Sequence, residues 1–522
     1  MANEWLSNFI SETITADGKI LLAVQFCMSL HGFKGESKEI LLGHLNSLSL
    51  FSPAIEEDFG IRVPQLAIYH WRLMKHVQAA FDLRTKAGVV ELAKWYVNLG
   101  HQELCATKGL VEWFAQNPDA TPYLRNELGL SSEETEKTLS NYRRIENQEP
   151  KKGNLSPKYD IIVFGFAGMT SGIGEDARRL FESLTASGMN ATLCDIGGYN
   201  STHRENQEIM SDFHISELEH PGRVHIFVAP ATELFNVSLQ FPSTFKGTFK
   251  TIGFFQWELD RWPEKLNFCL ELVDEIWTIS EHSAKAFRGA TRKTVIKMPI
   301  ATTIPDLFRL KELASSKVNR CFTFFFMYDP FSYVDRKNPE AVIQTFKQAF
   351  PPAEDHRVRL VVKILRDADI SSIRNLAGND QRIEFVCGTL ERGHLLDLLA
   401  NANCFVSLHR AEGYGRGIAE AMFLGVPCVV TKYSGNMDFC NDKTAFCVPY
   451  RLVKIKKNQY PYSEGLDWAE PDLNEAAAIL RRVYSSDGEV KKTTQNAMEL
   501  VSKNYSVEAC GAKYCSRIKE IT

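Results

Sequence analysis

Several features are missing from this 522-residue chain, and each absence excludes a class of protein. The first residues have no basic start followed by an apolar core, so we expect no secretory signal. No uncharged apolar run approaches the roughly 18 residues that a membrane-spanning helix needs. The 60 Lys and Arg residues are outnumbered by 64 Asp and Glu residues, which argues against a chain-wide nucleic-acid binder. We therefore expect a cytoplasmic protein that binds no nucleic acid.

The 12 cysteines are scattered and include no Cys-x-x-Cys pair. Zinc sites and disulfide frameworks both depend on cysteines at recognisable spacings. Cys404, Cys428 and Cys447 stand instead in apolar stretches, which is typical of buried free thiols. We predict free thiols, no disulfide and no zinc.

Residues 1–150 are predicted to form a helical N-terminal region. Apolar residues recur at helical spacing in 66–81 and 89–97, and 130–134 is typical of a capped helix start. The polar, Pro- and Gly-bearing stretch 147–157 indicates a linker. The region shows no catalytic constellation, so we interpret it as a docking or structural module.

From residue 159 onward, short apolar runs of strand length alternate with helical patterns. Such alternation predicts parallel sheets with helices on both faces. We expect a first Rossmann-like domain over 157–310 and a second over 318–505, with a cleft between them. The expected strands are 160–166, 191–193, 224–228, 251–255, 275–279 and 293–298 in the first domain, and 321–327, 358–364, 382–386, 404–408 and 426–430 in the second.

The stretch 404–427 carries the strongest functional signal. A strand ends near Leu408, a loop with glycines at 413, 415 and 417 follows, and a helix then runs to a terminating Gly425. Ligands of doubly wound sheets bind beyond the carboxyl ends of the strands. Glycines there let backbone N–H groups approach a phosphate, and the start of a helix favours the anion.

Two glutamates bracket that loop. Glu412 lies in it and Glu420 stands about one turn into the helix. Carboxylates accept hydrogen bonds only, so this pair suits the hydroxyls of a sugar or a ribose. The alternative is an ordinary strand–loop–helix with two surface glutamates.

The spacing of these glutamates resembles the Glu-x7-Glu signature of retaining GT-B glycosyltransferases of glycosyltransferase family four, the glycosyl transferases group 1. Segments 327–346, 431–439, 273–287 and 505–508 are also similar to that family, so that the resemblance runs from about residue 159 to 521. It is closest to bacterial enzymes that build lipopolysaccharide O-chains and capsules. The implied fold is GT-B, with a final helix, 506–522, that crosses back onto the first domain.

The resemblance also implies roles for individual residues. Lys337 would contact the donor diphosphate, helped by the backbone of Gly413, Tyr414 and Gly415. Glu420 would hold the ribose, and Glu412 the donor sugar. The implied reaction retains the anomeric configuration and uses neither a metal nor another cofactor.

The chain departs from the family at two places. The family's second phosphate cation is absent from 329–331, and Arg336 replaces it in our prediction because it adjoins Lys337, with Lys363 and Arg366 as alternatives. Where many relatives have a histidine, this chain has Gln256, Trp257 and Glu258. We predict that Glu258 orients a hydroxyl or stabilises developing positive charge; the alternative is an aromatic strand end packed in the core.

His409 is predicted to contact the donor sugar or to act as an acid–base group, the alternative being a hydrogen bond to the loop backbone. The catalytic candidates are thus Glu412, Glu258 and His409. Asp367 and Asp369 match a metal-binding Asp-x-Asp pattern, but they precede a helix and fit a helix cap better.

Residues 172–177 satisfy a dinucleotide-binding fingerprint, with Asp195 downstream. Five residues, 167–171, separate the strand from the first glycine, whereas in the dinucleotide fold that glycine follows the strand almost directly. We therefore predict that Gly172 and Gly174 belong to a cleft loop facing the donor phosphates or the acceptor.

The sequence thus predicts a glycosyltransferase that moves a mannose-, glucose- or rhamnose-like sugar from a nucleoside diphosphate to a growing bacterial surface polysaccharide or lipid-linked glycan. An NAD(P)-dependent oxidoreductase and a non-catalytic glycan- or partner-binding scaffold remain alternatives. Residues 454–457, with Tyr460 and Tyr462, are either a solvated loop or a contact with an anionic membrane. Peripheral contact with the inner membrane or with other polysaccharide-synthesis proteins is therefore left open.

Overall fold

The computed structural model describes residues 51, 53–64, 67–68, 71, 80–100, 108–146, 159–169, 171–196, 222–240, 245, 249–315, 321–352, 357–366 and 368–522. The chain divides into two compact units. The first comprises Met1–Ser156, Ile215–Pro221 and Thr232–Phe249, and the second comprises Pro157–His214, Gly222–Ala231 and Lys250–Thr522.

The described part of the first unit is helical. At the predicted helix start, Ser131 and Glu134 form a capping box, in which each side chain accepts a hydrogen bond from the other residue's backbone N–H at 3.2 and 2.8 Å. The core of the unit is aromatic, with Tyr96, Tyr123 and Tyr142 fully buried. Its helices are α4 (Pro53–Phe59), α7 (Lys86–Trp95), α9 (Lys108–Gln116), α10 (Ala120–Pro122) and α11 (Ser132–Glu146), with π-helical turns at Tyr96–Gly100 and Tyr123–Glu127 and most of α13 (Ala231–Gln240).

The second unit contains the two predicted sheets, each with six parallel strands. The first sheet has the order β2-β1-β3-β4-β5-β6 and the second the order β12-β11-β10-β7-β8-β9. The strands are β1 (Ile161–Gly165), β2 (Ala191–Asp195), β3 (Val224–Val228), β4 (Lys250–Phe255), β5 (Glu275–Thr278) and β6 (Thr294–Lys297), then β7 (Phe322–Tyr328), β8 (Val358–Ile364), β9 (Ile383–Val386), β10 (Cys404–Ser407), β11 (Cys428–Thr431) and β12 (Phe446–Val448).

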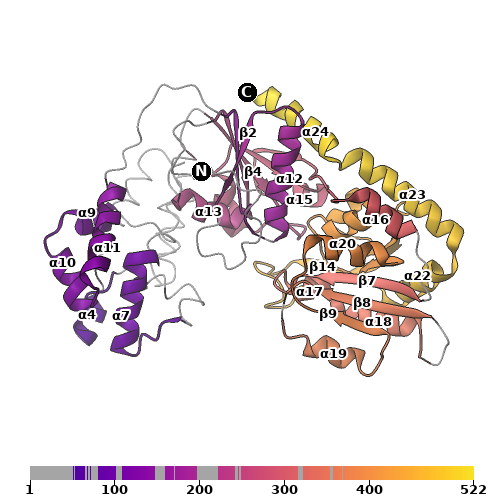
Figure 1. Ribbon diagram of the computed structural model, residues 1–522, viewed down its shortest axis with the longest axis horizontal. Coiled ribbons are helices and arrows are strands. Elements are labelled where there is room, and N and C mark those ends of the chain that lie inside the picture. The colour runs from indigo at the N-terminus through magenta and orange to yellow at the C-terminus, as the bar shows by residue number, and fades with distance from the viewer. Residues whose placement is uncertain are drawn as a thin grey trace. The chain divides into compact units, whose positions relative to one another are not determined.

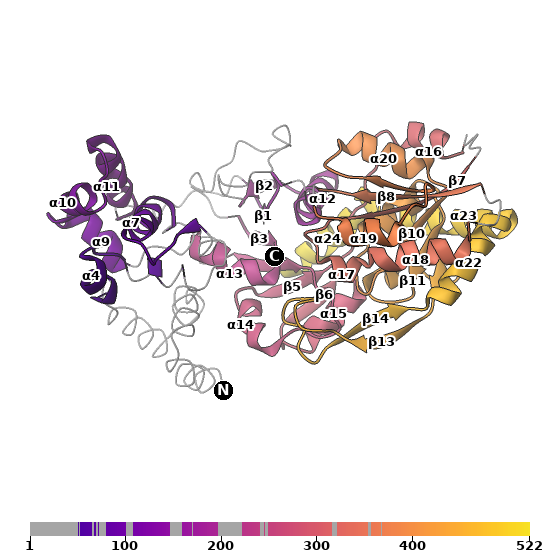
Figure 2. The ribbon, with the colours of Figure 1, turned by 90° about the horizontal axis from the view of Figure 1, so that it is seen from below.

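Helices flank both sheets. Of the helices that flank the second sheet, α18 and α22 lie side by side (Figure 1, Figure 2). The helices are α12 (Gly172–Ala186), α14 (Asn267–Leu270), α15 (Glu281–Arg288), α16 (Leu307–Ser315), α17 (Val334–Lys337), α18 (Pro339–Ala349), α19 (Ser371–Ala377), α20 (Arg392–Asn401), α21 (Arg416–Phe423), α22 (Leu473–Ser485), α23 (Asp487–Asn504) and α24 (Val507–Ile521).

Burial on both faces explains why these strands read as continuous apolar runs. Every residue of β1, β3 and β10 is buried, as expected of parallel strands covered by helices on either side. The predicted doubly wound α/β architecture is confirmed. The prediction did not include β12 or the antiparallel hairpin β13 (Tyr450–Lys454) and β14 (Asp467–Pro471), which stands apart from the main sheets (Figure 2).

Within the second unit, the last two helices join the two sheets. The α23 helix packs on α21. The α24 helix packs on α12, which flanks the first sheet (Figure 1). On α24, Arg517 forms two hydrogen bonds with the carboxylate of Glu275, at 2.9 and 2.6 Å. The buried ring of Tyr514 stacks on Trp277 with centroids 5.7 Å apart. A Cβ on Gly511 would stand 2.2 Å from the backbone oxygen of Ser183, so only glycine allows this approach of α24 to α12.

We expect Gly511→Ala to push α24 off α12 and to lower the free energy of unfolding by about 1–3 kcal/mol, the usual cost of overpacking. Gly488→Ala on α23 is the matched control, because a Cβ there meets nothing within 4 Å. Thermal unfolding followed by circular dichroism compares the two variants. Equal melting temperatures would contradict the close contact.

Candidate functional site

The glycine loop of the motif is held against a second loop at the carboxyl edge of the second sheet. The backbone N–H of Glu412 donates to Ser434 Oγ at 2.7 Å, and that of Gly435 donates to the carbonyl of Glu412 at 2.8 Å. A Cβ on Gly435 would lie 2.0 Å from the Gly413 oxygen. Gly415 has φ +93°, a conformation that glycine adopts at low cost. Gly415 and Gly435 are therefore required by the fold of the two loops themselves.

Glu412 is buried among cations. Its carboxylate accepts hydrogen bonds from Lys337 Nζ at 2.6 Å and from Arg336 Nη1 at 3.1 Å. Burial alone would raise the pKa of Glu412, but Lys337 and Arg336 outweigh it and lower that pKa to about 2. The carboxylate is therefore ionised at neutral pH and can act only as a hydrogen-bond acceptor.

The segment that carries both cations has an unusual backbone. Tyr333 and Asn338, which flank α17, have φ of +57° and +56°, a left-handed conformation that is uncommon outside glycine. The side chain of Asn338 donates to the Leu408 carbonyl at 3.0 Å. This bond fixes α17 beside the end of β10, where Lys337 reaches Glu412.

Arg336 lies between the two sheets, with a side chain only 4% exposed. Its Nη1 also donates to the Ala411 carbonyl at 3.0 Å. Its Nη2 stands 3.6 Å from Glu258, in the loop after β4 of the first sheet. Burial would lower the pKa of Arg336, but Glu258 and Glu412 raise it above its ordinary value. The guanidinium is therefore a permanent cation shared by two carboxylates.

Glu258 receives a further hydrogen bond, 2.5 Å long, from the hydroxyl of Tyr460. Its neighbour Trp257 is buried and packs edge-on against Trp262, with centroids 4.8 Å apart. The packing agrees with the alternative for the tryptophans, whereas the role predicted for Glu258 stays a prediction. The tryptophans pack in the core, and Glu258 faces the cations of the second sheet.

His409 is fully buried, and both of its ring nitrogens are engaged. Nδ1 lies 3.0 Å from Ser407 Oγ, and Nε2 lies 3.0 Å from Asn436 Oδ1 and 3.2 Å from the Tyr433 carbonyl. Because both partners of Nε2 accept hydrogen bonds, Nε2 carries the proton and Nδ1 accepts from the serine hydroxyl. Burial lowers the pKa of His409. Both ring nitrogens thus hold the loop, as the alternative expects, and the predicted contact of His409 with the donor sugar stays a prediction.

The side chain of Tyr414 is also engaged within the fold. It is buried against Phe439 and Tyr505, and its hydroxyl hydrogen-bonds Thr302 at 3.1 Å. The ring therefore packs on the connection between the sheets. Only the backbone of Tyr414 is left for the predicted donor contact.

Glu420 lies at the opposite end of the motif, buried on α21. It accepts a 2.5 Å hydrogen bond from Arg392, the first residue of α20. Arg416, the first residue of α21, forms an ion pair with Asp176, the fifth residue of α12. The sequence interpretation missed Arg392 and Arg416. Only the position of Arg416 inside the motif could have indicated it.

Gly172 and Gly174, predicted to belong to a cleft loop, are instead the first and third residues of α12. The Ser171 side chain caps this helix by accepting from the N–H of Gly174 at 3.3 Å. A Cβ on Gly174 would stand 2.4 Å from the Met169 oxygen, whereas one on Gly172 would meet nothing within 4 Å. Gly174 is thus needed for the loop to fold back on itself, which accounts for half of the dinucleotide fingerprint without a ligand.

The other candidate cations and metal ligands have structural partners. Buried Lys363 donates to the carbonyls of Ile364 and Gly388, and Arg366 forms an ion pair with Asp329 at 3.3 Å. Asp369 accepts from the backbone of Ser371 at the start of α19, as a helix cap does, whereas Asp367 lies outside the described residues.

In the part of the chain that the structure describes, no helix is long and apolar enough to cross a membrane. No group of three His, Cys, Asp or Glu residues within this part could hold a metal ion. The ten cysteines it contains are free thiols.

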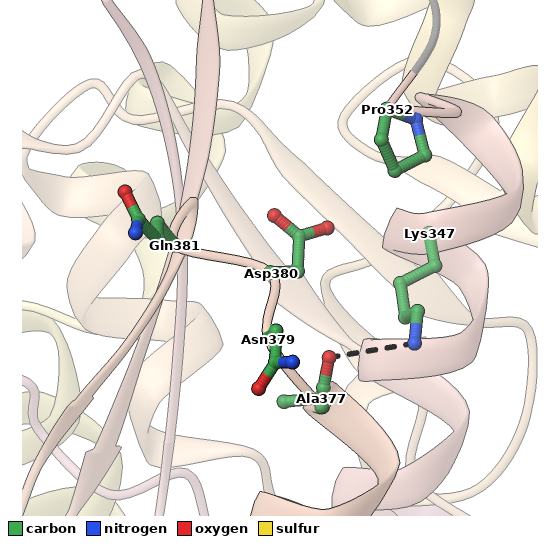
Figure 3. A pocket seen from close by; sticks show the side chains of 7 residues that line it. Lys347, Pro352, Ala377, Asn379, Asp380 and Gln381 are labelled. Carbon is green, nitrogen blue, oxygen red and sulfur yellow. Dashed lines mark hydrogen bonds between the residues drawn. The ribbon is translucent and has the colours of Figure 1, made fainter.

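A pocket of about 410 Å³ opens between α18 and the end of α19 (Figure 3). It shares no residue with the cluster of Glu258, Arg336, Lys337 and Glu412, which we call the cleft cluster. Lys347 on its wall donates to the Leu376 carbonyl at 2.9 Å, so its ammonium ties two helices together.

Comparisons with known proteins agree with this architecture. Residues 326–469 match the family model described as Glycosyl transferases group 1. A sucrose-phosphate synthase from Thermosynechococcus elongatus is similar in structure, with a TM-score of 0.51 and 14% identity over 70% of this chain and 99% of that one. A trehalose-6-phosphate synthase has a TM-score of 0.50 and 10% identity over 69% and 99%. No curated protein sequence matches the chain.

At these identities the two synthases show a shared fold. The matched segment begins in β7 and ends in β14, so it contains Lys337, Glu412 and Glu420. Residues 326–469 are therefore similar to the glycosyl transferases group 1, within a chain that has the GT-B fold of these two structures.

Proposed function

We propose that this protein is a metal-independent glycosyltransferase that moves a sugar from a nucleoside diphosphate to a hydroxyl of a growing glycan, with retention. The observation that carries the proposal is the ionised Glu412 carboxylate, held by Lys337 and Arg336 beside the glycine loop. This loop lies at the carboxyl end of a parallel strand, where doubly wound sheets bind ligands.

Lys337 and the glycine loop serve the leaving diphosphate. The Lys337 side chain is 20% exposed, so its ammonium can leave Glu412 for an arriving phosphate oxygen. Backbone N–H groups of Gly413–Gly415 and the start of α21 add oriented dipoles. Such preorganised charge stabilises the negative charge that develops as the bond to the sugar breaks. Glu412, relieved of Lys337, then accepts from hydroxyls of the donor sugar.

The sugar carbon becomes positive as the diphosphate leaves. Glu258 supplies a carboxylate on the first-sheet side, and Tyr460 and Arg336 fix its position. Burial raises the pKa of Tyr460 well above its ordinary value, so its hydroxyl stays a donor to Glu258. We assign to Glu258 the orientation of the sugar and the stabilisation of that positive charge.

Glu420 and its neighbours serve the nucleoside. Arg392 holds the buried Glu420 carboxylate, which accepts from the ribose hydroxyls in our proposal. Arg416 supplies positive charge at the start of α21 and is paired with Asp176 of the first sheet. A donor phosphate competes with Asp176 for Arg416. Donor binding therefore weakens the ion pair that joins α21 to α12.

The acceptor that we propose is a bacterial surface polysaccharide or lipid-linked glycan. The support is the resemblance of segments 327–346 and 404–427 to enzymes that build such glycans. The donor is identified by measuring binding and hydrolysis of UDP-, GDP-, ADP- and dTDP-sugars, with NAD(P) included. Tight NAD(P) binding together with indifference to every nucleotide sugar would replace the proposal with an oxidoreductase.

We expect Lys337→Met to lower turnover of the identified donor by about 100-fold or more, the usual effect of removing one preorganised charge contact. Lys347→Met is the control. It also removes one lysine charge, but Lys347 belongs to α18 and lines the separate pocket. Steady-state kinetics and melting temperatures are measured together. Lys337→Met also leaves Glu412 with one cation fewer, and the melting temperature reports that loss of stability separately from turnover. Equal turnover by both lysine variants would refute the role of Lys337.

Glu420→Gln should weaken binding of the nucleoside diphosphate by about tenfold, because a ribose hydroxyl loses a charged acceptor worth about 1.5–3 kcal/mol. Calorimetry on the nucleoside diphosphate and its 2′,3′-dideoxy form gives the decisive comparison. Wild type should prefer the ribose form, and the variant should bind both forms alike. A preference that survives in the variant would remove Glu420 from the ribose site.

A further inference from the structure

Two loops beside Glu258 carry three exposed aromatic side chains and the buried Tyr460. Phe331 and Tyr333 come from the loop between β7 and α17, and Tyr460 and Tyr462 from the loop between β13 and β14. We call this set the aromatic wall. Phe331, Tyr333 and Tyr462 are 68%, 47% and 41% exposed. Exposed apolar clusters of this kind mark ligand grooves or interaction surfaces.

The wall leads to the cleft cluster in one continuous line. The ring of Tyr333 packs against that of Tyr460, with centroids 4.8 Å apart, and Tyr460 packs on Trp257 at 6.1 Å. The Tyr460 hydroxyl then reaches Glu258 at 2.5 Å. Tyr333 therefore exposes an aromatic surface that is immobilised from behind and lies two side chains from the candidate catalytic carboxylate.

The backbone of the wall is strained at its two exposed tyrosines. Tyr333 has φ +57° and Tyr462 has φ +53°, a region that bulky side chains rarely occupy. Each such residue costs about 1–3 kcal/mol and is retained where the surroundings over-determine it, often at ligand clamps. Both loops thus hold an exposed aromatic ring in place at a cost to stability.

The chemistry around the wall selects its ligand. The Glu258 side chain is 21% exposed, and Asp335 accepts from Gln459 across the two loops at 2.8 Å. A pyranose combines an apolar face of C–H groups with hydroxyl donors at its edge. Aromatic rings beside carboxylates match both features. The same carboxylates repel an anionic lipid surface, although Lys456 and Lys457 in the same loop would attract one.

We propose that the aromatic wall is an acceptor subsite, on which a pyranose ring of the acceptor glycan stacks on Tyr333 with its hydroxyl edge toward Glu258. This inference rests on the proposed glycosyltransferase function and adds the place where the acceptor is held. The loops of the wall come from the second sheet and from the β13–β14 hairpin.

Saturation-transfer NMR tests the subsite with methyl α-glycosides of glucose, mannose, galactose and rhamnose as probes. We expect saturation of the ring C–H protons of at least one glycoside by the wild-type protein. Tyr333→Ala should raise its Kd by about tenfold, equivalent to about 1.4 kcal/mol. Tyr333→Phe should bind as wild type does, since it keeps the ring. Tyr450→Ala, which removes an exposed tyrosine of β13 outside the wall, should also leave binding unchanged.

Binding of the identified nucleotide sugar and sedimentation with phosphatidylglycerol-containing vesicles are measured on the same four proteins. Unchanged donor binding in Tyr333→Ala shows that its fold and donor site are intact. The inference is overturned if no glycoside binds, if Tyr333→Ala binds like wild type, or if Tyr450→Ala loses as much. Loss of vesicle binding alone in Tyr333→Ala would assign the wall to a membrane instead. If no nucleotide sugar binds but a glycoside still does, the proposed glycosyltransferase function is overturned. The aromatic wall would then remain a glycan-binding surface.

Discussion

The cleft depends on one buried cation, Arg336. Its guanidinium lies between Glu258 of the first sheet and Glu412 of the second. A buried charge is tolerated only when it is paired and hydrogen-bonded, and removing a partner costs about 3–5 kcal/mol. The loop after β4 and the glycine loop after β10 must therefore stay within reach of the same side chain. The distance between the two carboxylates is set by that requirement.

Apolar packing also holds the glycine loop in place. Tyr414 belongs to the glycine loop, yet its ring packs on Phe439 and Tyr505 and its hydroxyl bonds Thr302 in the connection between the sheets. One short loop thus presents its backbone to the cleft and its side chain to the core. Loop movements that would reposition the glycines are resisted by this buried ring.

Local sequence chemistry explains the two sheets and the position of the motif. Apolar runs such as 322–328 and 404–407 are buried on both faces, so their strand character and parallel pairing follow from composition alone. The sequence also located Lys337, Glu412 and Glu420 on loops or helices next to strand ends. These predictions succeeded because strand, turn and helix signals act over a few residues.

The partners of those residues were decided only in three dimensions. Tyr460 donates to Glu258 across 202 positions of sequence, and Arg416 meets Asp176 between helices of different sheets. The buried hydrogen bonds of His409 likewise join two different loops. The positive φ of the exposed Tyr333 is also maintained by its surroundings in the fold. Periodicity and spacing identify which residue types carry chemistry. Which charge neutralises which, and which ring remains exposed, depends on long-range packing that no local pattern encodes.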